Sequence, residues 1–298
     1  MIQLDAVSKF VLSDLSLHVP EGEIVGLVGA SGAGKTTLLR LICGLLKADG
    51  GRVRTLGRDP IVWRSHYGAE ISTLLTGAPL LCGKDTVQQG FSLIRAAYHL
   101  SKSQFEQDYR VLSERLDFGK YDRETVENLS LGQRMRAELG AALIYRPKLL
   151  LLDEPSIGLD ENGKSALWEL LEDRSRMGMT VLLTSHDMPG ISRLCSRIAL
   201  LDGGRLVFYG SEKNLKSRYA PVDVMAVTVS GRLPDLEDLP LTHYSVEGNL
   251  LTMSYDSNYI SSAEILKLIL GQTTVSGVNI RKPNLESIIT QLKEGRNI

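Results

Sequence analysis

Cysteine is scarce in this sequence: only Cys43, Cys82 and Cys195 occur among its 298 residues. Three scattered thiols in mostly apolar surroundings predict buried, reduced side chains, as in a cytosolic protein, and argue against a disulfide or metal framework. Long apolar runs are also missing, since the run at residues 149–152 is far shorter than the roughly 20 residues that cross a bilayer. With no basic and apolar leader at Met1 either, we expect a role at a membrane to depend on a partner.

The sequence also has no excess of positive or negative charge, since its 34 lysines and arginines nearly balance its 35 aspartates and glutamates. A net charge of −1 gives no general attraction to polyanions, so we expect no nucleic-acid partner. The hydrophobic fraction of 43% and the charged fraction of 23% are ordinary for a globular protein. A chain of 298 residues is long enough for one large domain and a smaller one.

Strand and helix patterns alternate along the first 219 residues. Short alternating strands before the turn at residues 20–22 predict an antiparallel N-terminal subdomain. Apolar residues at helical spacing predict a helical insertion at about residues 85–146, with its last helix at 131–145. Buried strands that alternate with helices predict a parallel sheet and an α/β fold, and their expected positions are 24–28, 71–75, 149–153 and 180–184, followed by a hairpin at 198–210.

The sequence pattern changes near residue 220. Residues 222–230 and 244–255 have strand character, the second stretch with a turn at 247–249. Residues 262–270 have helical character, 274–280 strand character and 284–292 helical character. Ser261 and Glu264 have the spacing of a capping box for the first of these helices. We therefore expect a small α+β accessory domain at residues 220–298, with the order β-β-α-β-α.

A glycine-rich stretch, GASGAGKTT, follows the apolar strand at residues 24–28. A strand that leads into a glycine-rich turn and then a helix leaves several backbone N–H groups pointing at one spot, which is an anion site. Lys35 would reach the β- and γ-phosphate oxygens and Thr36 would ligate Mg²⁺, whereas the alternative is a glycine-rich turn with a surface lysine. The predicted phosphate-binding residues are Gly29, Ala30, Ser31, Gly32, Ala33, Gly34, Lys35, Thr36 and Thr37.

Two later strands end in groups suited to triphosphate chemistry. LLLLDE puts Asp153 where it can hold Mg²⁺ through water, and puts Glu154 where it can orient or deprotonate an attacking water. TSHD ends the next strand with His186, which is placed to hydrogen-bond a γ-phosphate. Taken alone, an acidic residue at a strand end or a single histidine often has only a structural role. After a phosphate-binding loop, both favour a nucleoside triphosphate site.

The segment NLSLGQRMR, residues 128–136, places a serine and a glycine at the start of a helix and so predicts a second phosphate-facing helix N-terminus. The order of phosphate loop, LSLGQ, LLLLDEP, GLD and SHD resembles the ATP-binding subunits of ABC transporters across residues 1–219. The resemblance implies a P-loop NTPase core, with ATP and Mg²⁺ as cofactors and ATP hydrolysis as the activity.

The resemblance also implies that two such domains face head to tail and enclose two ATP molecules between them. Each ATP would lie between residues 29–37 of one copy and Ser130, Gly132 and Gln133 of a second copy or of a homologous ATPase subunit. Asp160 would lie in the loop that crosses the seam.

Further roles follow from the resemblance. Glu154 would be the general base and His186 would contact the γ-phosphate, while Phe10 is the candidate that stacks on adenine. The helical insertion would meet a membrane-spanning transporter subunit, and the protein would be cytoplasmic and peripheral on the inner face of the cell membrane. The ending PNLESII, at residues 283–289, resembles that of ABC exporters and favours an exporter with a separately encoded membrane subunit.

Two positions depart from the family pattern. Leu131 replaces the first glycine of the usual LSGGQ, although Ser130, Gly132 and Gln133 remain. The strand at 71–75 should end in a glutamine that reaches Mg²⁺, and alignment to the following Thr-Val places Gly77 at that position. Water can replace a missing Mg²⁺ ligand, and Thr76 ranks below water because neighbouring strand residues point to opposite faces.

Other readings of the sequence remain open. An ABC-type ATPase that acts on ribosomes or DNA would ordinarily carry two cassettes or long coiled coils, and neither is present in these residues. A regulatory module that binds ATP without hydrolysing it is favoured only by Gly77. The sequence does not identify the cargo, or whether the two ATPase subunits are identical.

Overall fold

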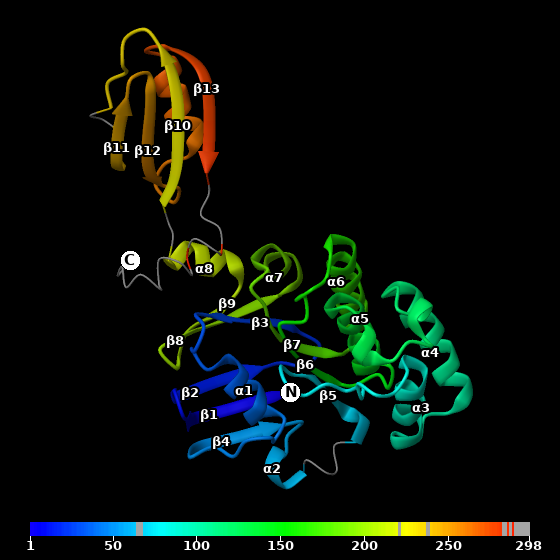
Figure 1. Cartoon of the computed structure of the whole chain (residues 1–298). Coiled ribbons are helices and arrows are strands. Elements are labelled where there is room, and N and C mark those ends of the chain that lie inside the picture. The colour runs from blue at the N-terminus through cyan, green and yellow to red at the C-terminus, as the bar shows by residue number, and fades with distance from the viewer. Residues whose placement is uncertain (64–67, 220–221, 237–238, 282–284, 286–287, 289–298) are drawn as a thin grey trace. The chain divides into compact units, whose positions relative to one another are not determined.

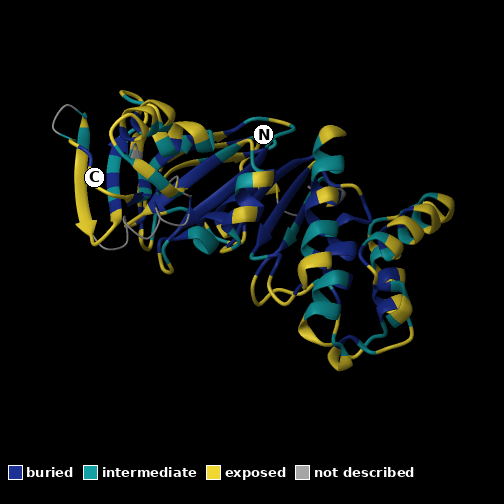
Figure 2. Cartoon of the chain, turned by 90° about the horizontal axis from the view of Figure 1, so that it is seen from above, coloured by how far each residue is buried: buried dark blue, intermediate teal, exposed yellow. Residues whose placement is uncertain are grey.

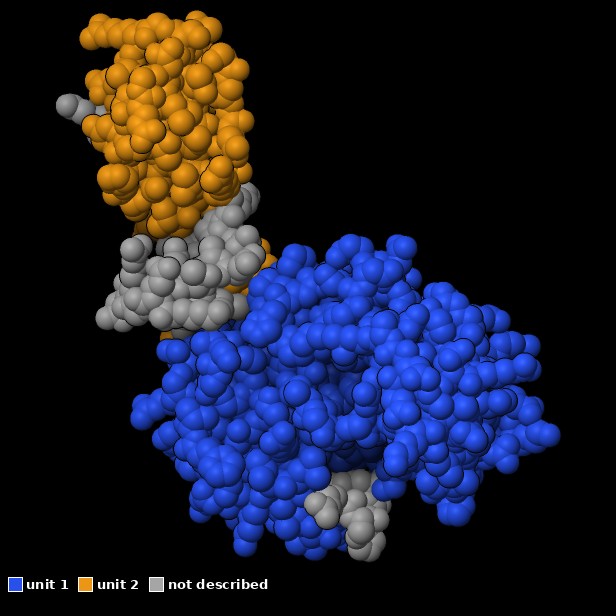
Figure 3. All heavy atoms as spheres, viewed as in Figure 1, with its two compact units in different colours: residues 1–211 blue, residues 212–298 orange. Residues whose placement is uncertain are grey.

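The computed structural model describes residues 1–298 except 64–67, 220–221, 237–238, 282–284, 286–287 and 289–298. The chain divides into two compact units, residues 1–211 and residues 212–298 (Figures 1 and 3). The division precedes helix α8 (Glu212–Tyr219), which the sequence analysis assigned to the first domain.

The first unit is built on a six-stranded sheet in the order β5-β6-β7-β3-β8-β9, in which only the β8–β9 pair is antiparallel. All residues of β3, β6 and β7 are buried, as expected for parallel strands covered on both faces (Figure 2). The predicted parallel sheet is confirmed, with these bounds: β3 (Ile24–Gly29), β5 (Ile71–Leu74), β6 (Leu149–Asp153), β7 (Thr180–Thr184), β8 (Arg197–Asp202) and β9 (Arg205–Gly210).

The helices α1 (Lys35–Ile42), α6 (Glu161–Arg176) and α7 (Met188–Leu194) follow strands of this sheet in the chain. Helix α1 ends at Ile42, and Gly44, with a left-handed φ of 73°, follows its C-cap residue Cys43. A Cβ atom at Gly44 would meet the Pro60 carbonyl oxygen at 2.2 Å, so glycine is required there.

A second, antiparallel sheet with the order β2-β1-β4 confirms the predicted N-terminal subdomain. Its strands are β1 (Ile2–Lys9), β2 (Leu12–Val19) and β4 (Gly50–Thr55). Their inward residues share one core with the apolar face of α1. The short helices α2 (Pro60–Trp63) and η2 (Gly68–Glu70) lie between β4 and β5 in the chain.

The predicted helical insertion consists of α3 (Val87–Ala97), α4 (Lys102–Arg115), the short turns η3 (Gly119–Tyr121) and η4 (Val126–Asn128), and α5 (Leu131–Leu143). Aromatic rings form its core: Phe91 stacks on Phe118 with ring centroids 5.2 Å apart, and the edge of Tyr109 meets Phe91 at 4.8 Å. Gly140 of α5 lets Phe118 approach, because a Cβ atom there would lie 2.5 Å from the ring. The close fit holds α5 against the rest of the insertion.

The second unit holds a four-stranded sheet with the order β11-β12-β10-β13, and α9 (Ser262–Leu270) contributes Ile265 and Ile269 to its core. The predicted capping box of Ser261 and Glu264 is confirmed. The turn expected at residues 247–249 is present and separates β11 from β12, so the described part of this unit after α8 has the order β-β-β-α-β. Most of the predicted last helix, residues 284–292, lies outside the described residues. The strands are β10 (Val222–Ser230), β11 (Leu241–Glu247), β12 (Leu250–Asp256) and β13 (Thr274–Arg281).

The cysteines only partly match the expectation of buried thiols. Cys43 is buried and Cys195 is partly buried, but Cys82 is exposed, because it lies in the loop between β5 and α3. All three are free. Among the described residues, no helix combines the length and the apolar character needed to cross a membrane.

Candidate nucleotide-binding and catalytic site

The loop between β3 and α1 leaves the N-terminus of α1 open to an anion. Gly34 is the N-cap residue with a φ of 101°, no side chain caps the helix, and its first turn holds no acidic residue. The amides of this turn are therefore available to phosphate oxygens. Glycine is required at two positions, because a Cβ atom at Gly29 would lie 2.3 Å from the Leu201 carbonyl oxygen and one at Gly34 would lie 2.5 Å from Leu12.

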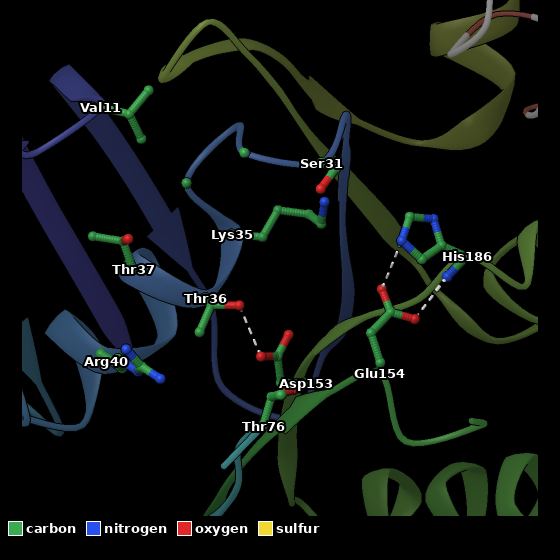
Figure 4. Close-up of a pocket in the computed structure, with 12 residues that line it drawn as sticks. Val11, Ser31, Lys35, Thr36, Thr37, Arg40, Thr76, Asp153, Glu154 and His186 are labelled. Carbon is green, nitrogen blue, oxygen red and sulfur yellow. Dashed lines mark hydrogen bonds and ion pairs between the residues drawn. The ribbon is translucent and has the colours of Figure 1, made fainter. Parts of the chain in front are cut away.

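A cavity of about 350 Å³ opens in front of this helix end (Figure 4). Its wall combines the phosphate loop with the ends of β6 and β7 and with the turn after β5. The lining residues are Val11, Ser31, Gly32, Gly34, Lys35, Thr36, Thr37, Arg40, Thr76, Asp153, Glu154 and His186. Of the predicted phosphate-binding residues, Gly29, Ala30 and Ala33 shape the loop without lining the cavity.

Four hydrogen bonds, two made by Lys35 and two accepted by Asp153, hold the polar side chains of the cavity in place. Lys35 Nζ donates to the carbonyl oxygens of Gly29 and Ala30, both at 2.9 Å, which holds the ammonium group over the loop. Thr36 Oγ1 donates to Asp153 Oδ2 at 2.8 Å, and Thr184 Oγ1 donates to Asp153 Oδ1 at 2.7 Å. A hydroxyl and a carboxylate in contact at a phosphate site match the oxygen ligands that Mg²⁺ takes, so these residues fit that ion.

Glu154 follows Asp153 in a strained backbone conformation, with a φ of 55°. Its N–H group donates to Thr184 Oγ1 at 3.0 Å, and its Oε2 accepts the His186 backbone N–H at 3.0 Å. Oε1 is buried and has no hydrogen-bond partner among the described residues, although His186 Nε2 lies 3.5 Å away. This oxygen has a lone pair available to a water molecule, which fits a general base.

The N-terminus of α5 forms a capping box of its own. Ser130 Oγ accepts the Gln133 N–H at 3.3 Å, and Gln133 Oε1 accepts the Ser130 N–H at 2.8 Å. Gly132 touches the loop before α6, because a Cβ atom there would lie 2.3 Å from the Gly158 carbonyl oxygen. Ser130, Gly132 and Gln133 do not line the phosphate cavity of their own chain. Leu131, which replaces the family glycine, is 59% exposed.

Asp160 caps helix α6, where its carboxylate accepts the Gly163 N–H at 2.9 Å and pairs with Arg136. The Gly163 amide and the Arg136 guanidinium hold the pKa of Asp160 below its ordinary value. This contact ties the loop after β6 to helix α5.

Phe10 occupies the turn between β1 and β2 and is 74% exposed, with a φ of 52°. Its neighbour Val11 lines the cavity, whereas Phe10 does not. Both residues lie in the two-residue turn between β1 and β2, and of the two it is Val11 that lines the cavity. The sequence analysis did not identify Val11 or Arg40 as lining residues, and no motif marks them.

The structure changes the assignment of Thr76 and Gly77. Ala78 N–H donates to the Leu75 carbonyl oxygen at 3.0 Å, so residues 75–78 form a turn in which Gly77 has a φ of 81°. Thr76 lines the phosphate cavity, while Gly77 lines only a neighbouring apolar cavity. Ranking Thr76 below water was therefore based on a wrong geometry, because the strand ends at Leu74 and its alternation does not extend to residue 76.

A phosphate loop after the central strand, a neighbouring hydroxyl and aspartate pair, and an adjacent glutamate define a P-loop nucleoside triphosphatase. The ABC transporter family model matches residues 12–157. The chain is 32% identical to the Nod factor export ATP-binding protein I of Cupriavidus pinatubonensis, over 95% of this chain and 86% of that protein. It is 30% identical to the daunorubicin resistance ATP-binding protein DrrA3 of Streptomyces coeruleorubidus, over 95% of this chain and 91% of that protein.

A solved ATP-binding subunit of an ABC transporter has the same fold, with a TM-score of 0.68 and 24% identity, over 73% of this chain and 92% of that one. The chain therefore belongs to the ABC transporter family. It is an ATP-binding subunit whose ATPase activity is coupled to transport, and such subunits work with membrane subunits.

Proposed function

We propose that this chain binds Mg-ATP in the cavity of Figure 4 and hydrolyses it to power the export of a substrate through a separately encoded membrane subunit. The observation that carries the proposal is the convergence, in one cavity, of an uncapped helix N-terminus, Lys35, the Thr36–Asp153 pair and Glu154. These groups supply phosphate binding, metal ligation and a general base, which together are the parts that phosphoryl transfer to water requires.

Each residue has a separate task in this proposal. The amides of α1 and Lys35 bind the phosphates, and Thr36 and Asp153 hold Mg²⁺, which supplies positive charge to the phosphate oxygens. Glu154 Oε1 accepts the proton of the attacking water, and His186, 3.5 Å from that oxygen, hydrogen-bonds the γ-phosphate.

The signature residues act in a second copy of the chain or in a homologous ATPase subunit. Ser130, Gly132 and Gln133 do not line their own chain's phosphate cavity, and the α5 N-terminus that carries them is a further anion site. Two copies facing head to tail complete both sites, and Asp160 lies at the seam. ATP is therefore the ligand that brings the two copies together.

The relatives favour export over import. The daunorubicin resistance and Nod factor export proteins each match over 95% of this chain, which includes the second unit. We infer that the subunit is cytoplasmic and peripheral on the inner face of the cell membrane, where the helical insertion contacts its membrane partner. A net charge of −1 gives no support to a nucleic-acid partner.

The test is capture of the tagged full-length chain from solubilised membranes of its host, followed by ATP turnover with and without the captured partner. We expect a membrane-spanning protein to be recovered and the turnover to increase several-fold in its presence. Recovery with ribosomes or DNA, in salt that screens weak charge contacts, would contradict the exporter assignment.

A further inference from the structure

A single carboxylate holds the loop that carries Thr76. The Leu80 N–H donates to Glu138 Oε2 at 2.7 Å, and the Leu81 N–H donates to Glu138 Oε1 at 3.4 Å. Glu138 is only 3% exposed, and Leu81 is 1% exposed. The loop therefore begins in the phosphate cavity, at Thr76, and ends on a buried acid of helix α5.

Glu138 lies in the same helix as the signature residue Ser130, about two turns further along. Because an α-helix of this length moves as one piece, the position of the Glu138 carboxylate fixes the distance between the loop and the helix start. Arg134, one turn before Glu138, places its Nε 3.7 Å from Oε1. Burial raises the pKa of Glu138, whereas the two amides and Arg134 act in the opposite direction.

A buried carboxylate at this position needs an explanation, because an apolar side chain would avoid its desolvation. Packing does not provide one. The apolar cavity of about 350 Å³ lies beside this contact and is lined by Thr76, Gly77, Pro79, Met135, Glu138 and Glu154, among others. The loop and the helix are thus not closely packed there. The two hydrogen bonds from the Leu80 and Leu81 backbone amides to Glu138 hold them together beside the cavity.

We propose that Glu138 is a positioning residue that makes the Thr76 loop and the N-terminus of α5 move as one body. The inference rests on the proposed ATPase function, because its consequence is that a nucleotide contacting Thr76 also shifts Ser130 toward the second copy. Loss of the Glu138 carboxylate leaves the phosphate loop intact, but contact of the nucleotide with Thr76 then no longer shifts Ser130.

The test compares three variants of the full-length chain with the parent. Glu138→Ala removes both bonds, and Glu138→Gln keeps a carbonyl oxygen for the closer Leu80 N–H. Asp108→Asn is the matched control: Asp108 is 4% exposed, lies on α4 and binds Arg146 at 2.7 and 2.9 Å, and it lines neither cavity. The measurements are the Kd for Mg-ATP, and kcat and KM for hydrolysis.

We expect Glu138→Ala to lower kcat at least tenfold while Kd changes less than twofold. Glu138→Gln should restore kcat to within threefold of the parent, and Asp108→Asn should keep kcat within twofold. An unchanged kcat in Glu138→Ala would overturn the proposal. An equal loss of kcat and of Mg-ATP affinity in Glu138→Ala and Asp108→Asn would overturn it too, since it would indicate a general loss of structure.

Hydrogen exchange supplies a readout that does not depend on turnover. At a concentration where light scattering shows the parent as a monomer, Mg-ATP should slow exchange at residues 29–37, 76–81 and 130–138 of the parent. In Glu138→Ala only the first segment should respond. The same response of all three segments in that variant would overturn the proposal, whereas a parent that binds Mg-ATP without hydrolysing it would count against the proposed function alone.

Discussion

Two loops line the phosphate cavity, and they are held in different ways. The phosphate loop follows β3, which lies inside the sheet between β7 and β8, and its glycines at 29 and 34 leave no room for a Cβ atom. The turn that carries Thr76 follows β5, an edge strand of the same sheet, and the segment after the turn is held by Glu138.

We therefore expect the two loops to have different tasks: the phosphate loop determines nucleotide binding, and the Thr76 loop influences turnover. Backbone packing against neighbouring strands fixes where phosphates bind, and a single side-chain substitution outside the loop does little to it. The position of Thr76 depends on two amide hydrogen bonds beside a cavity, so it is adjustable. We therefore expect substitutions in the first loop to abolish binding, and substitutions around the second to alter turnover.

The largest effect is expected at the phosphate loop. Lys35→Ala removes the ammonium group held over Gly29 and Ala30, and should weaken Mg-ATP binding at least a hundredfold, measured by titration with a fluorescent ATP analogue. Lys47→Ala, at an exposed lysine beyond the end of α1, is the control and should bind like the parent. Equal affinity of Lys35→Ala and the parent would mean that nucleotide binds elsewhere.

Ser130→Ala should lower turnover at least tenfold and leave the affinity of the single chain for Mg-ATP unchanged, because in the proposed head-to-tail pair Ser130 contacts the nucleotide of the other copy. The variant also loses a helix cap, which costs roughly 1 kcal/mol. Ser261→Ala provides the control, since it removes the same kind of capping box from α9. If both variants lose turnover equally, the effect is one of stability and the signature role is wrong.

Substitutions at Thr76 and Gly77 should have smaller effects, which differ in kind: the first should lower kcat, and the second should lower stability. Thr76→Val keeps the shape of the side chain but removes its hydroxyl from the cavity, and should lower kcat about tenfold by loss of an oriented polar group. Gly77→Gln should leave kcat within twofold and cost about 1–2 kcal/mol of unfolding free energy in urea, because its φ of 81° disfavours a side chain. Turnover gained by Gly77→Gln, with Thr76→Val unaffected, would restore Gly77 as the residue at the glutamine position.

The smallest effect is expected at Phe10, in the turn between β1 and β2. Phe10 is 74% exposed, so we expect Phe10→Ala to weaken ATP binding less than threefold, while Val11→Asp, which places a charge in the cavity wall, should weaken it tenfold or more. The same titration measures both. A tenfold loss in Phe10→Ala alone would support stacking of Phe10 on adenine.

The sequence alone was sufficient to place site residues where a motif directly follows a buried strand. GASGAGKTT and LLLLDE come directly after buried strands, so the positions of Lys35, Asp153 and Glu154 follow from the chain itself. The capping box at Ser261 is equally local. In each case the interacting residues are within a few positions of one another or of a strand end.

The remaining features depend on contacts between distant segments. Thr76 was ranked below water because the loop between β5 and α3 contains a turn at Gly77 that no local pattern marks. Glu138 was missed because its partners, Leu80 and Leu81, are more than 50 residues away in the sequence. Cys82 was expected to be buried from its apolar neighbours, yet its exposure is set by the path of the same loop.

The most direct test of the central claim is the mass of Glu154→Gln in light scattering, with and without Mg-ATP. This substitution keeps the phosphate loop and the Thr36–Asp153 pair but removes the general base, so bound ATP persists and holds two copies together. We predict that the mass is near that of one chain without nucleotide and near twice that value with Mg-ATP. In the double variant that also carries Ser130→Ala, the mass with Mg-ATP should return to that of one chain. A monomer under both conditions, despite measured Mg-ATP binding and with the membrane partner present, would contradict the account.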